Sequence, residues 1–257
     1  AVINVKSITD PDYIDNNFIV MCTEDGTIKK TSLEAYSRPR QNGIIAITIR
    51  EGDRLLDVAL TNGNNQIVIA TNTGRSVRFE ETRVRPMGRS AAGVKGIWID
   101  EDIPTEKVVG MVCVSDPEVQ QLLVVSEKGF GKRSEVEDYR LTNRGGKGVK
   151  TINITEKTGD LIAILAVDNE LDFMIINKSG ITIRLRVEDL RVMGRATQGV
   201  RLISLRGSDE IAAVTAVIKD EEEEERSSDI VMESDSSIEA SADSSDVDES
   251  NEENSAE

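Results

Sequence analysis

The amino-acid sequence predicts an all-β, propeller-like fold built from blades of about 50 residues with four strands each. Three observations predict this fold. A short apolar run, followed by three polar residues and a glycine, occurs four times along the chain. In every repeat a second glycine follows 17 to 19 residues later, and a β-branched residue comes directly after it. Each repeat then ends in another apolar run, so most of its residues are typical of strands.

The repeats divide most of the chain without linkers. The first glycines are Gly26, Gly74, Gly129 and Gly180, and the second glycines are Gly43, Gly93, Gly148 and Gly199. We expect a β domain over residues 1–217, with complete repeats at about 17–64, 65–119, 120–170 and 171–217, followed by a tail at 218–257. A set of tandem β-barrels is the main alternative, and the uniform spacing disfavours it.

The strands of one repeat follow from its pattern. The first apolar run and the residues after the first glycine predict a hairpin with that glycine in its turn. A longer basic loop follows. A third strand is expected after the second glycine, as at Ile45–Ile49 and Val149–Ile154, and the closing apolar run is the fourth. Helix is expected to be minor, with one turn at Ser32–Tyr36.

The first residues of the chain look like the end of another repeat. Ala1–Val5 is similar to the closing runs Ile164–Val167 and Val214–Val217, and residue 1 is not methionine. This predicts that the chain is the C-terminal portion of a larger protein and starts with the closing strand of an earlier repeat.

Most of the net charge lies in the tail. The chain has 47 acidic and 31 basic residues, a net charge of −16, and residues 220–257 alone hold 17 acidic residues and Arg226. The rest of the chain is therefore neutral. The tail is too poor in apolar residues to fold and is predicted to be disordered. It is either a solubility tail or a polyanion that competes for a basic surface.

The basic residues of the β domain are concentrated in part of each repeat. Windows that run from the first glycine to just past the second (26–49, 74–97, 129–152 and 180–203) hold 21 basic and 8 acidic residues. If the blades stack in register, these residues form one basic edge. Such an edge is typical of a phosphate-binding track. The alternative is that its arginines join neighbouring blades through Asp and Glu or lie on a solvated face.

The predicted DNA-binding residues fall largely into columns of the repeat alignment. Lys30, Arg78, Arg133 and Arg184 lie four residues after the first glycine. Relative to the second glycine, Arg85, Arg140 and Arg191 lie eight before, Arg89, Arg144 and Arg195 four before, and Lys95, Lys150 and Arg201 two after. The first repeat breaks these last columns and offers Arg38 and Arg40 instead. Lys29, Arg75, Lys132, Lys147 and Arg186 complete the set.

Composition excludes several other functions. With no histidine and two cysteines, the chain lacks the residues for Ser-His-Asp catalysis, for a histidine-ligated metal or for a cysteine-based zinc site. We therefore expect no catalytic residue, no metal and no cofactor. The longest apolar run, Leu161–Val167, is far shorter than the ~20 residues that span a membrane. Aromatic residues make up only 3 %, which disfavours single-strand binding and leaves duplex DNA held by its backbone.

Several motifs resemble the C-terminal domain of the DNA gyrase A protein. They are Gly26–Thr31, Arg85–Arg89 with Gly93–Gly96, Gly129–Arg133 and Val192–Val200. The resemblance implies a β-pinwheel whose basic perimeter wraps duplex DNA, so that the ATP-driven holoenzyme introduces negative supercoils. It implies the rest of gyrase A and the gyrase B protein as partners, ATP and Mg²⁺ used elsewhere in the holoenzyme, and a bacterial cytoplasmic, nucleoid-associated location. The corresponding domain of topoisomerase IV and a propeller-like protein-interaction scaffold remain as alternatives.

Two features depart from that family. Its signature box lies in an earlier blade, whereas here Arg144, Gly145, Gly146, Lys147 and Gly148 match only the last five residues of the box, in the third repeat. This loop either has the function of the box or, as we favour, resembles it only because the repeats resemble one another. The cleavage domain with its tyrosine is also absent. Tyr36 and Tyr139 share a column with Val84 and Leu190, so they are predicted to be packing residues.

Overall fold

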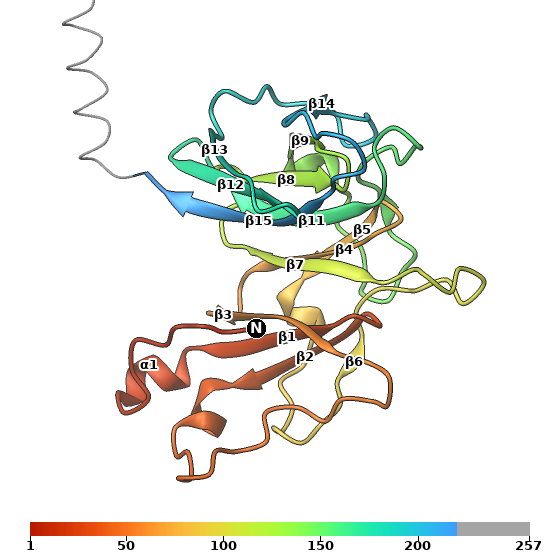
Figure 1. The fold of residues 1–257 in the computed structure, drawn as a ribbon. Coiled ribbons are helices and arrows are strands. Elements are labelled where there is room, and N and C mark those ends of the chain that lie inside the picture. The colour runs from red at the N-terminus through yellow and green to blue at the C-terminus, as the bar shows by residue number, and fades with distance from the viewer. Residues whose placement is uncertain (220–257) are drawn as a thin grey trace, which may run out of the picture. The chain divides into compact units, whose positions relative to one another are not determined.

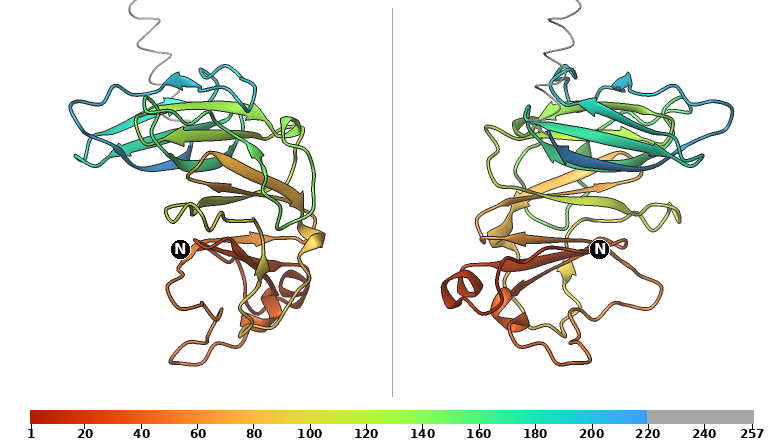
Figure 2. Two further views of the ribbon diagram at one scale, coloured as in Figure 1. Left: turned by 90° about the vertical axis from the view of Figure 1, so that its right-hand side faces the viewer. Right: turned by 60° about the vertical axis from the view of Figure 1, so that its left-hand side comes forward.

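The structure is a computed structural model that describes residues 1–219, and Ala1–Val217 form one compact unit. The predictions about the acidic tail from residue 220 onward lie outside the described residues. Within residues 1–219 no helix is long and apolar enough to cross a membrane. The unit is all-β and contains four small sheets that follow one another in chain order (Figures 1 and 2), which confirms the propeller-like prediction.

The strands repeat with the period of the sequence. The first repeat contains β1 (Phe18–Thr23), β2 (Thr27–Ser32) and β3 (Leu55–Thr61). The second contains β4 (Gln66–Thr71), β5 (Arg75–Glu80), β6 (Val94–Lys95) and β7 (Val108–Val114). The third contains β8 (Gln121–Ser126), β9 (Phe130–Glu135), β10 (Val149–Lys150) and β11 (Leu161–Val167). The fourth contains β12 (Leu171–Asn177), β13 (Thr182–Arg186), β14 (Val200–Arg201) and β15 (Ile211–Ile218).

The predicted hairpins form in all four repeats. In the first, β1 and β2 are antiparallel with Phe18 opposite Ser32 and Cys22 opposite Ile28. Gly26 has a φ of 78° in the connecting turn, a conformation that glycine adopts without strain. The closing strand β3 pairs with the other side of β1. Each sheet therefore has the first hairpin strand in its interior.

The fourth strand of a sheet comes from the next repeat. The sheet orders are β3-β1-β2-β6, β10-β5-β4-β7, β11-β8-β9-β14 and β13-β12-β15. Repeats two to four thus each supply the four strands predicted for a repeat, but the third of these strands completes the sheet of the repeat before it. The strand after the second glycine joins the preceding sheet, where it pairs with the second strand of that sheet's hairpin. This exchange couples every sheet to the next along the chain.

The exchanged strands are also shorter than predicted. The expected strand Val149–Ile154 is confined to β10, and the expected strand Ile45–Ile49 has no counterpart among the described strands. In the first repeat this segment has no preceding hairpin in the chain to pair with. Ile3 and Val5, from the segment compared with a closing strand, pack against the apolar cluster around Ile19 and Met21 without forming a strand.

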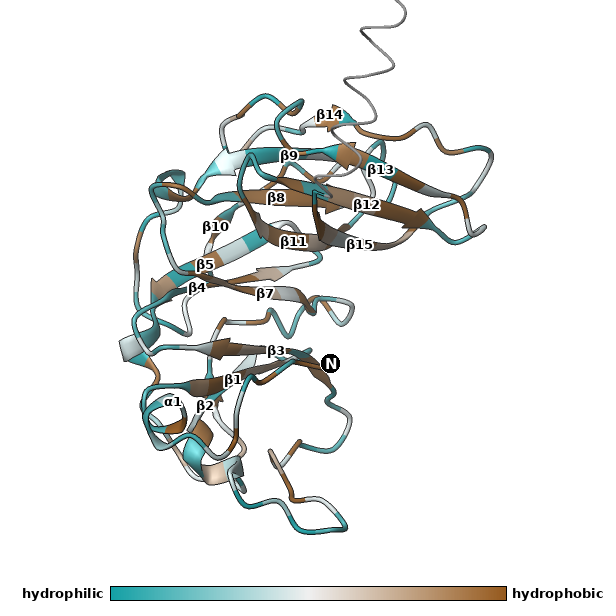
Figure 3. Cartoon of the chain, turned by 90° about the vertical axis from the view of Figure 1, so that its left-hand side faces the viewer, coloured by the Kyte–Doolittle hydropathy of each residue, from teal (hydrophilic) through white to brown (hydrophobic). Residues whose placement is uncertain are grey.

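The cores lie between consecutive sheets. Ile67 and Ile69 of β4 pack with residues of the first sheet, whereas Val68 and Ala70 of the same strand pack with residues of the third repeat. Because successive side chains point to opposite faces, a strand between two sheets is apolar at every position. This arrangement explains the continuous apolar runs of the sequence, which Figure 3 shows as hydrophobic central strands.

Helices are few and short in the described part of the chain. The predicted turn at Ser32–Tyr36 is confirmed as the 3₁₀ helix η1 (Leu33–Tyr36), where the Ser32 side chain accepts a hydrogen bond from the Glu34 N–H. Equivalent turns are η2 (Glu81–Arg83) and η3 (Val136–Asp138). The sequence did not predict α1 (Pro11–Asp15), which Asp10 caps through the N–H groups of Asp12 and Tyr13.

Candidate nucleic-acid interface

The twenty predicted basic residues fall into three groups by exposure. The exposed group is Arg38, Arg40, Arg75, Arg85, Lys95, Arg140, Lys147, Lys150, Arg184, Arg186, Arg191 and Arg201. The half-buried group is Arg89, Arg144 and Arg195, and the buried group is Lys29, Lys30, Arg78, Lys132 and Arg133. Only the first two groups present charge at the surface.

In the first three repeats, the basic residue four after the first glycine joins adjacent repeats. Arg78 donates from Nη1 to the carbonyl oxygens of Val136 and Tyr139 in the next repeat, at 2.8 and 2.9 Å. Arg133 binds the carbonyl oxygens of Leu190 and Glu188 in the same way. Lys30 forms a 2.9 Å salt bridge with Glu81. These side chains lie on strands buried on both faces, so they stabilise the 3₁₀ turn or loop of the following repeat.

Two further lysines are buried behind the basic loops. Lys29 donates to the carbonyl oxygens of Ala46, at 2.6 Å, and Arg89. Lys132 donates to the carbonyl oxygen of Gly194 at 2.5 Å. Burial lowers the pKa of each ammonium to about 8, because a charged amine loses its hydration there. Through these hydrogen bonds both lysines fix the basic loop of the next repeat from its buried side.

The half-buried arginines, which we call the junction arginines, lie where consecutive loops meet. Arg144 donates to the carbonyl oxygen of Lys95 at 3.0 Å and to that of Arg83 at 3.1 Å. Arg195 donates to the carbonyl oxygens of Lys150, at 2.7 Å, and Asp138, at 3.0 Å. These arginines join neighbouring repeats, but through backbone carbonyl oxygens and not through the Asp and Glu side chains that the alternative named.

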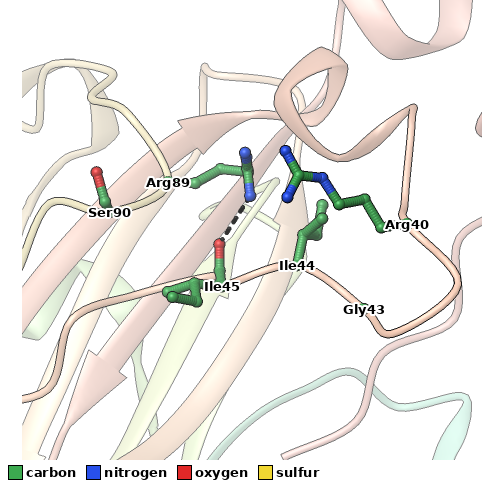
Figure 4. A pocket seen from close by; sticks show the side chains of 6 residues that line it. All are labelled: Arg40, Gly43, Ile44, Ile45, Arg89 and Ser90. Atoms are coloured by element: carbon green, nitrogen blue, oxygen red, sulfur yellow. Dashed lines mark hydrogen bonds between the residues drawn. The ribbon is translucent and has the colours of Figure 1, made fainter.

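Each junction brings two cations into neighbouring positions. Arg144 binds the backbone of Lys95, and Arg195 binds that of Lys150. Arg89 donates to the carbonyl oxygen of Ile45 at 3.1 Å, and here the second cation comes from Arg40. Figure 4 shows the guanidinium groups of Arg40 and Arg89 facing each other beside Gly43, in a pocket of about 370 Å³. The first repeat has Ile45 in the column of Lys95 and Lys150, and Arg40 supplies the second cation of the pair in its place.

The other surface columns are tied to the same junctions. Lys95, Lys150 and Arg201 lie in the exchanged strands β6, β10 and β14. Arg85, Arg140 and Arg191 each precede a residue that bridges to the preceding hairpin; the bridges are Lys30 to Pro86, Arg78 to Leu141 and Arg133 to Val192. Backbone pairing thus fixes the start of each basic loop against the previous sheet.

Carboxylates neutralise few of these cations. Across residues 1–219, three of the twenty form salt bridges: Lys30 with Glu81, Arg184 with Asp172, and Arg186 with Glu188. The junction arginines are bonded to carbonyl oxygens, which leave their positive charge uncompensated. Such a surface favours a polyanion.

The loop Arg144–Gly148 packs on an aromatic residue that the sequence did not single out. Lys147 Nζ lies 4.1 Å from the ring centroid of Trp98, and the Trp98 backbone N–H donates to the Gly146 carbonyl oxygen at 3.0 Å. Gly145 has a φ of 79°. Trp98 lies five residues after Gly93, and this place just beyond the basic loop could have drawn attention to it in the sequence. Cation–π contact orients the Lys147 ammonium at the surface of the third-repeat loop.

The two tyrosines occupy the packing column predicted for them. Tyr139 is fully buried beside Val136, and its hydroxyl is 2.7 Å from Thr151 Oγ1. Burial raises the pKa of Tyr139. Tyr36 packs against the cluster of the first sheet and donates to the Ala46 carbonyl oxygen. Neither hydroxyl is placed as an accessible nucleophile.

Comparison with known proteins agrees with this architecture. The family model described as the DNA gyrase C-terminal domain, beta-propeller, matches residues 17–62, 65–115, 120–168 and 171–218. The DNA gyrase A protein of Staphylococcus aureus strain NCTC 8325 is 44% identical over 229 residues, which cover 89% of this chain and 25% of that protein. The gyrase A protein of strain MRSA252 is 44% identical over 221 residues, 86% of this chain and 24% of that protein. The chain thus spans about a quarter of these relatives.

Solved structures share the fold at low sequence identity. The C-terminal domain of DNA topoisomerase IV gives a TM-score of 0.75 at 21% identity, over 84% of this chain and 65% of that one. The DNA gyrase A C-terminal domain gives 0.72 at 22%, over 84% and 69%. The E. coli ParC C-terminal domain gives 0.61 at 20%, over 80% and 83%. With four matched segments over most of its length, the chain belongs to the DNA gyrase C-terminal domain family.

Proposed function

We propose that this chain is the non-catalytic, DNA-wrapping part of a gyrase A protein. One observation carries the proposal: each of three consecutive junctions holds a pair of surface cations, Arg40 with Arg89, Lys95 with Arg144, and Lys150 with Arg195. The spacing of the pairs is set by the exchanged strands, so the cations recur once per sheet. Duplex DNA, with evenly spaced phosphates on its outside, is the polyanion that suits such a row.

Contacts to DNA phosphates suit the wrapping of a duplex better than the recognition of a particular base sequence. Bending a short duplex costs several kcal/mol, and only many simultaneous phosphate contacts offset that cost. The columns supply cations on every repeat. The junction arginines are held by backbone carbonyls, which reduces the entropy lost when they meet phosphate. No element among residues 1–219 has the length of a recognition helix.

The wrapping would serve a larger enzyme. We propose that the remainder of gyrase A and the gyrase B protein are its partners, and that these parts carry the cleavage tyrosine and the ATP-dependent steps. Bent DNA would then be presented for strand passage in the bacterial cytoplasm. Negative supercoiling of relaxed plasmid by the full enzyme is the result that distinguishes this role from that of topoisomerase IV.

The test reverses the charge of one exposed column only, the one that lies two residues after the second glycine. Lys95, Lys150 and Arg201 are replaced together by glutamate, which leaves the junction arginines in place. The matched control reverses Lys6, Lys107 and Lys128, which are also exposed but lie outside the basic windows. DNA affinity is measured on a ~100 base-pair duplex against salt, together with the topology of nicked circles ligated in the presence of protein.

We expect the first variant to lose wrapping and to show a salt slope smaller by about 0.9 for each lost phosphate contact. The control should weaken binding slightly and keep the topological change. If both variants behaved alike, or if binding by the unmodified chain did not fall with salt, DNA wrapping at this edge would be refuted. Binding to a protein partner without DNA affinity would point to the scaffold function.

A further inference from the structure

An arginine followed by an exposed apolar residue recurs in the basic loop of every repeat. The pairs are Arg38 with Pro39, Arg85 with Pro86, Arg140 with Leu141 and Arg191 with Val192, and both members of every pair are exposed. We call Pro39, Pro86, Leu141 and Val192 the edge apolar residues. Their side chains differ in size and branching, so apolar character is what the four repeats share at this position. Single exposed apolar residues are common on proteins, but one at the same place in each repeat is not random scatter.

The backbone that carries Leu141 is fixed on both sides by Arg78 of the preceding repeat. The Arg78 guanidinium donates to the Tyr139 carbonyl oxygen at 2.9 Å, and the Thr142 N–H donates to the Arg78 carbonyl oxygen at 2.9 Å. Leu141 lies between these two hydrogen bonds and forms a β-bridge with Arg78. It nevertheless remains 48% exposed.

Backbone pairing holds the edge apolar residues of the fourth and second repeats in the same manner. In the fourth repeat, the Met193 N–H donates to the Arg133 carbonyl oxygen at 2.9 Å, and the Arg133 side chain donates to the Leu190 carbonyl oxygen. In the second repeat, the Met87 N–H donates to the Lys30 carbonyl oxygen at 2.8 Å. Three repeats therefore present an apolar side chain to solvent on a backbone of fixed position.

Arginines lie on both sides of the edge apolar residues. Leu141 follows the exposed Arg140. The carbonyl oxygen of Asp138, three residues before Leu141, accepts a 3.0 Å hydrogen bond from Arg195 of the next repeat. Arg144 binds the second repeat at the equivalent carbonyl oxygen. Single apolar side chains and arginines thus alternate along the basic edge.

The surface next to Leu141 is also hollowed. The residues on either side of it, Arg140 and Thr142, line a hollow of about 120 Å³. Lys147 adds a second cation to the wall, and Asn143 adds an amide. None of the described residues that line the hollow is acidic. An anion can therefore approach close to the exposed leucine.

A combination of cations and single apolar side chains matches the surface of the DNA minor groove. Phosphates stand on both rims of this groove, and its walls are deoxyribose, whose C–H groups are apolar. The groove is about 6 Å wide in B-DNA, which is too narrow for a helix but wide enough for one side chain. A wrapped duplex turns its minor groove toward the protein about every 10 base pairs. The major groove offers an apolar contact only at thymine methyl groups.

The direction of the bend decides how a side chain meets this groove. Apolar side chains that enter between base pairs from the minor groove kink the duplex toward its major groove, and so away from the protein. A duplex that wraps around the basic edge bends the opposite way, and its inward minor groove becomes narrower. The edge apolar residues therefore suit packing between the two sugar walls and not insertion between bases.

We infer that the edge apolar residues pack against the deoxyribose walls of the minor groove where it faces the basic edge. This inference rests on the proposed DNA-wrapping function and adds to it a contact that is not ionic. The arginines bind the phosphates at the rims, and burial of sugar C–H groups against proline, leucine and valine contributes affinity that salt does not screen. Because every nucleotide of DNA carries the same sugar, this contact does not depend on base sequence.

The first experiment separates the apolar contact from the ionic contacts. A double variant, Leu141→Asn with Val192→Thr, replaces two edge apolar residues by polar residues of similar size and adds no charge. The control, Ile103→Asn with Val119→Thr, makes the corresponding change at exposed positions outside the basic windows, where Ile103 is 42% exposed. The affinity of the full chain for a ~100 base-pair duplex is measured over a range of salt concentrations.

We expect the double variant to bind on the order of tenfold more weakly at every salt concentration, with an unchanged salt slope, because the slope counts phosphate contacts only. The control should match the unmodified chain. Full affinity in the double variant, an equal loss in the control, or a smaller slope would overturn the inference. The proposed function is judged on the unmodified chain: binding that does not fall with salt refutes both, whereas salt-dependent binding that the double variant retains in full refutes the inference alone.

The second experiment identifies the part of the DNA that residue 141 contacts. Leu141→Cys is labelled with benzophenone maleimide, which bonds to nearby C–H groups on illumination, and the nucleotide adducts are identified by mass spectrometry. Val119→Cys is the control site, and the unsubstituted chain gives the background from its own cysteines. We expect deoxyribose adducts, several times more abundant from residue 141 than from residue 119. Adducts mainly on thymine methyl groups would place the side chain in the major groove, and equal yields would separate it from the DNA; either result would overturn the inference.

Discussion

Arg140 and Arg144 are four residues apart in one loop, yet their side chains have different surroundings. Arg140 is exposed, whereas Arg144 is half-buried and donates to the carbonyl oxygens of Arg83 and Lys95. Both are basic residues of the predicted DNA-binding columns. The first is available to phosphate alone, and the second also holds two loops together. Stability and DNA affinity should therefore separate when the two are mutated.

We predict that Arg144→Ala lowers the free energy of unfolding by about 1.5–3 kcal/mol, because two carbonyl oxygens lose a charged donor. Arg140→Ala should change it by less than about 0.5 kcal/mol, as for most surface substitutions. Urea unfolding followed by circular dichroism measures both, and duplex affinity should fall in both. Equal stabilities would show that the hydrogen bonds of Arg144 contribute nothing net.

At the scale of the element, the exchanged strand is the feature that joins one sheet to the next. Gly199 precedes β14 and has a φ of 83°, and a Cβ there would lie 2.5 Å from the Gly131 carbonyl oxygen. Gly43 has a φ of 78° with open space around it. The two glycines share a backbone conformation, and they differ in whether a strand of another sheet lies against them.

We predict that Gly199→Ala destabilises the chain by several kcal/mol, because the methyl group forces β14 away from β9. Gly43→Ala should lose only about 1 kcal/mol, the cost of alanine at positive φ. Thermal unfolding of both variants measures the difference. A similar loss in both variants would mean that backbone strain, and not the close approach, explains the glycine.

At the scale of the whole molecule, charge is divided between the basic edge and the acidic tail. The tail from residue 220 onward carries most of the net charge of −16. We predict that a chain ending at Lys219 binds duplex DNA more tightly than the full chain, most clearly at low salt where charges are least screened. Fluorescence anisotropy at two salt concentrations measures this. An unchanged affinity would leave the tail as a solubility element.

Pattern and spacing predicted much of the fold. The hairpins, their glycine turns, the closing strands, the turn at Ser32–Tyr36 and the packing of Tyr139 are all local or periodic features, and the structure confirms them. Local sequence specifies them because turn geometry and alternating burial are properties of a few adjacent residues. The candidate columns likewise came from spacing, and most of them reach the surface.

The partners of strands and side chains came only from the tertiary structure. A two-residue strand such as Val149–Lys150 pairs with Arg75 and Ser76 of a hairpin in the preceding repeat, and nothing in its own sequence names that partner. Likewise, Arg78 and Arg140 are both arginines in basic columns, yet Arg78 lies on a strand enclosed by sheets on both faces. The local sequence determines which residues form strands and turns. The burial of a side chain depends instead on which sheets pack against its strand, and this packing is a property of the assembled sheets.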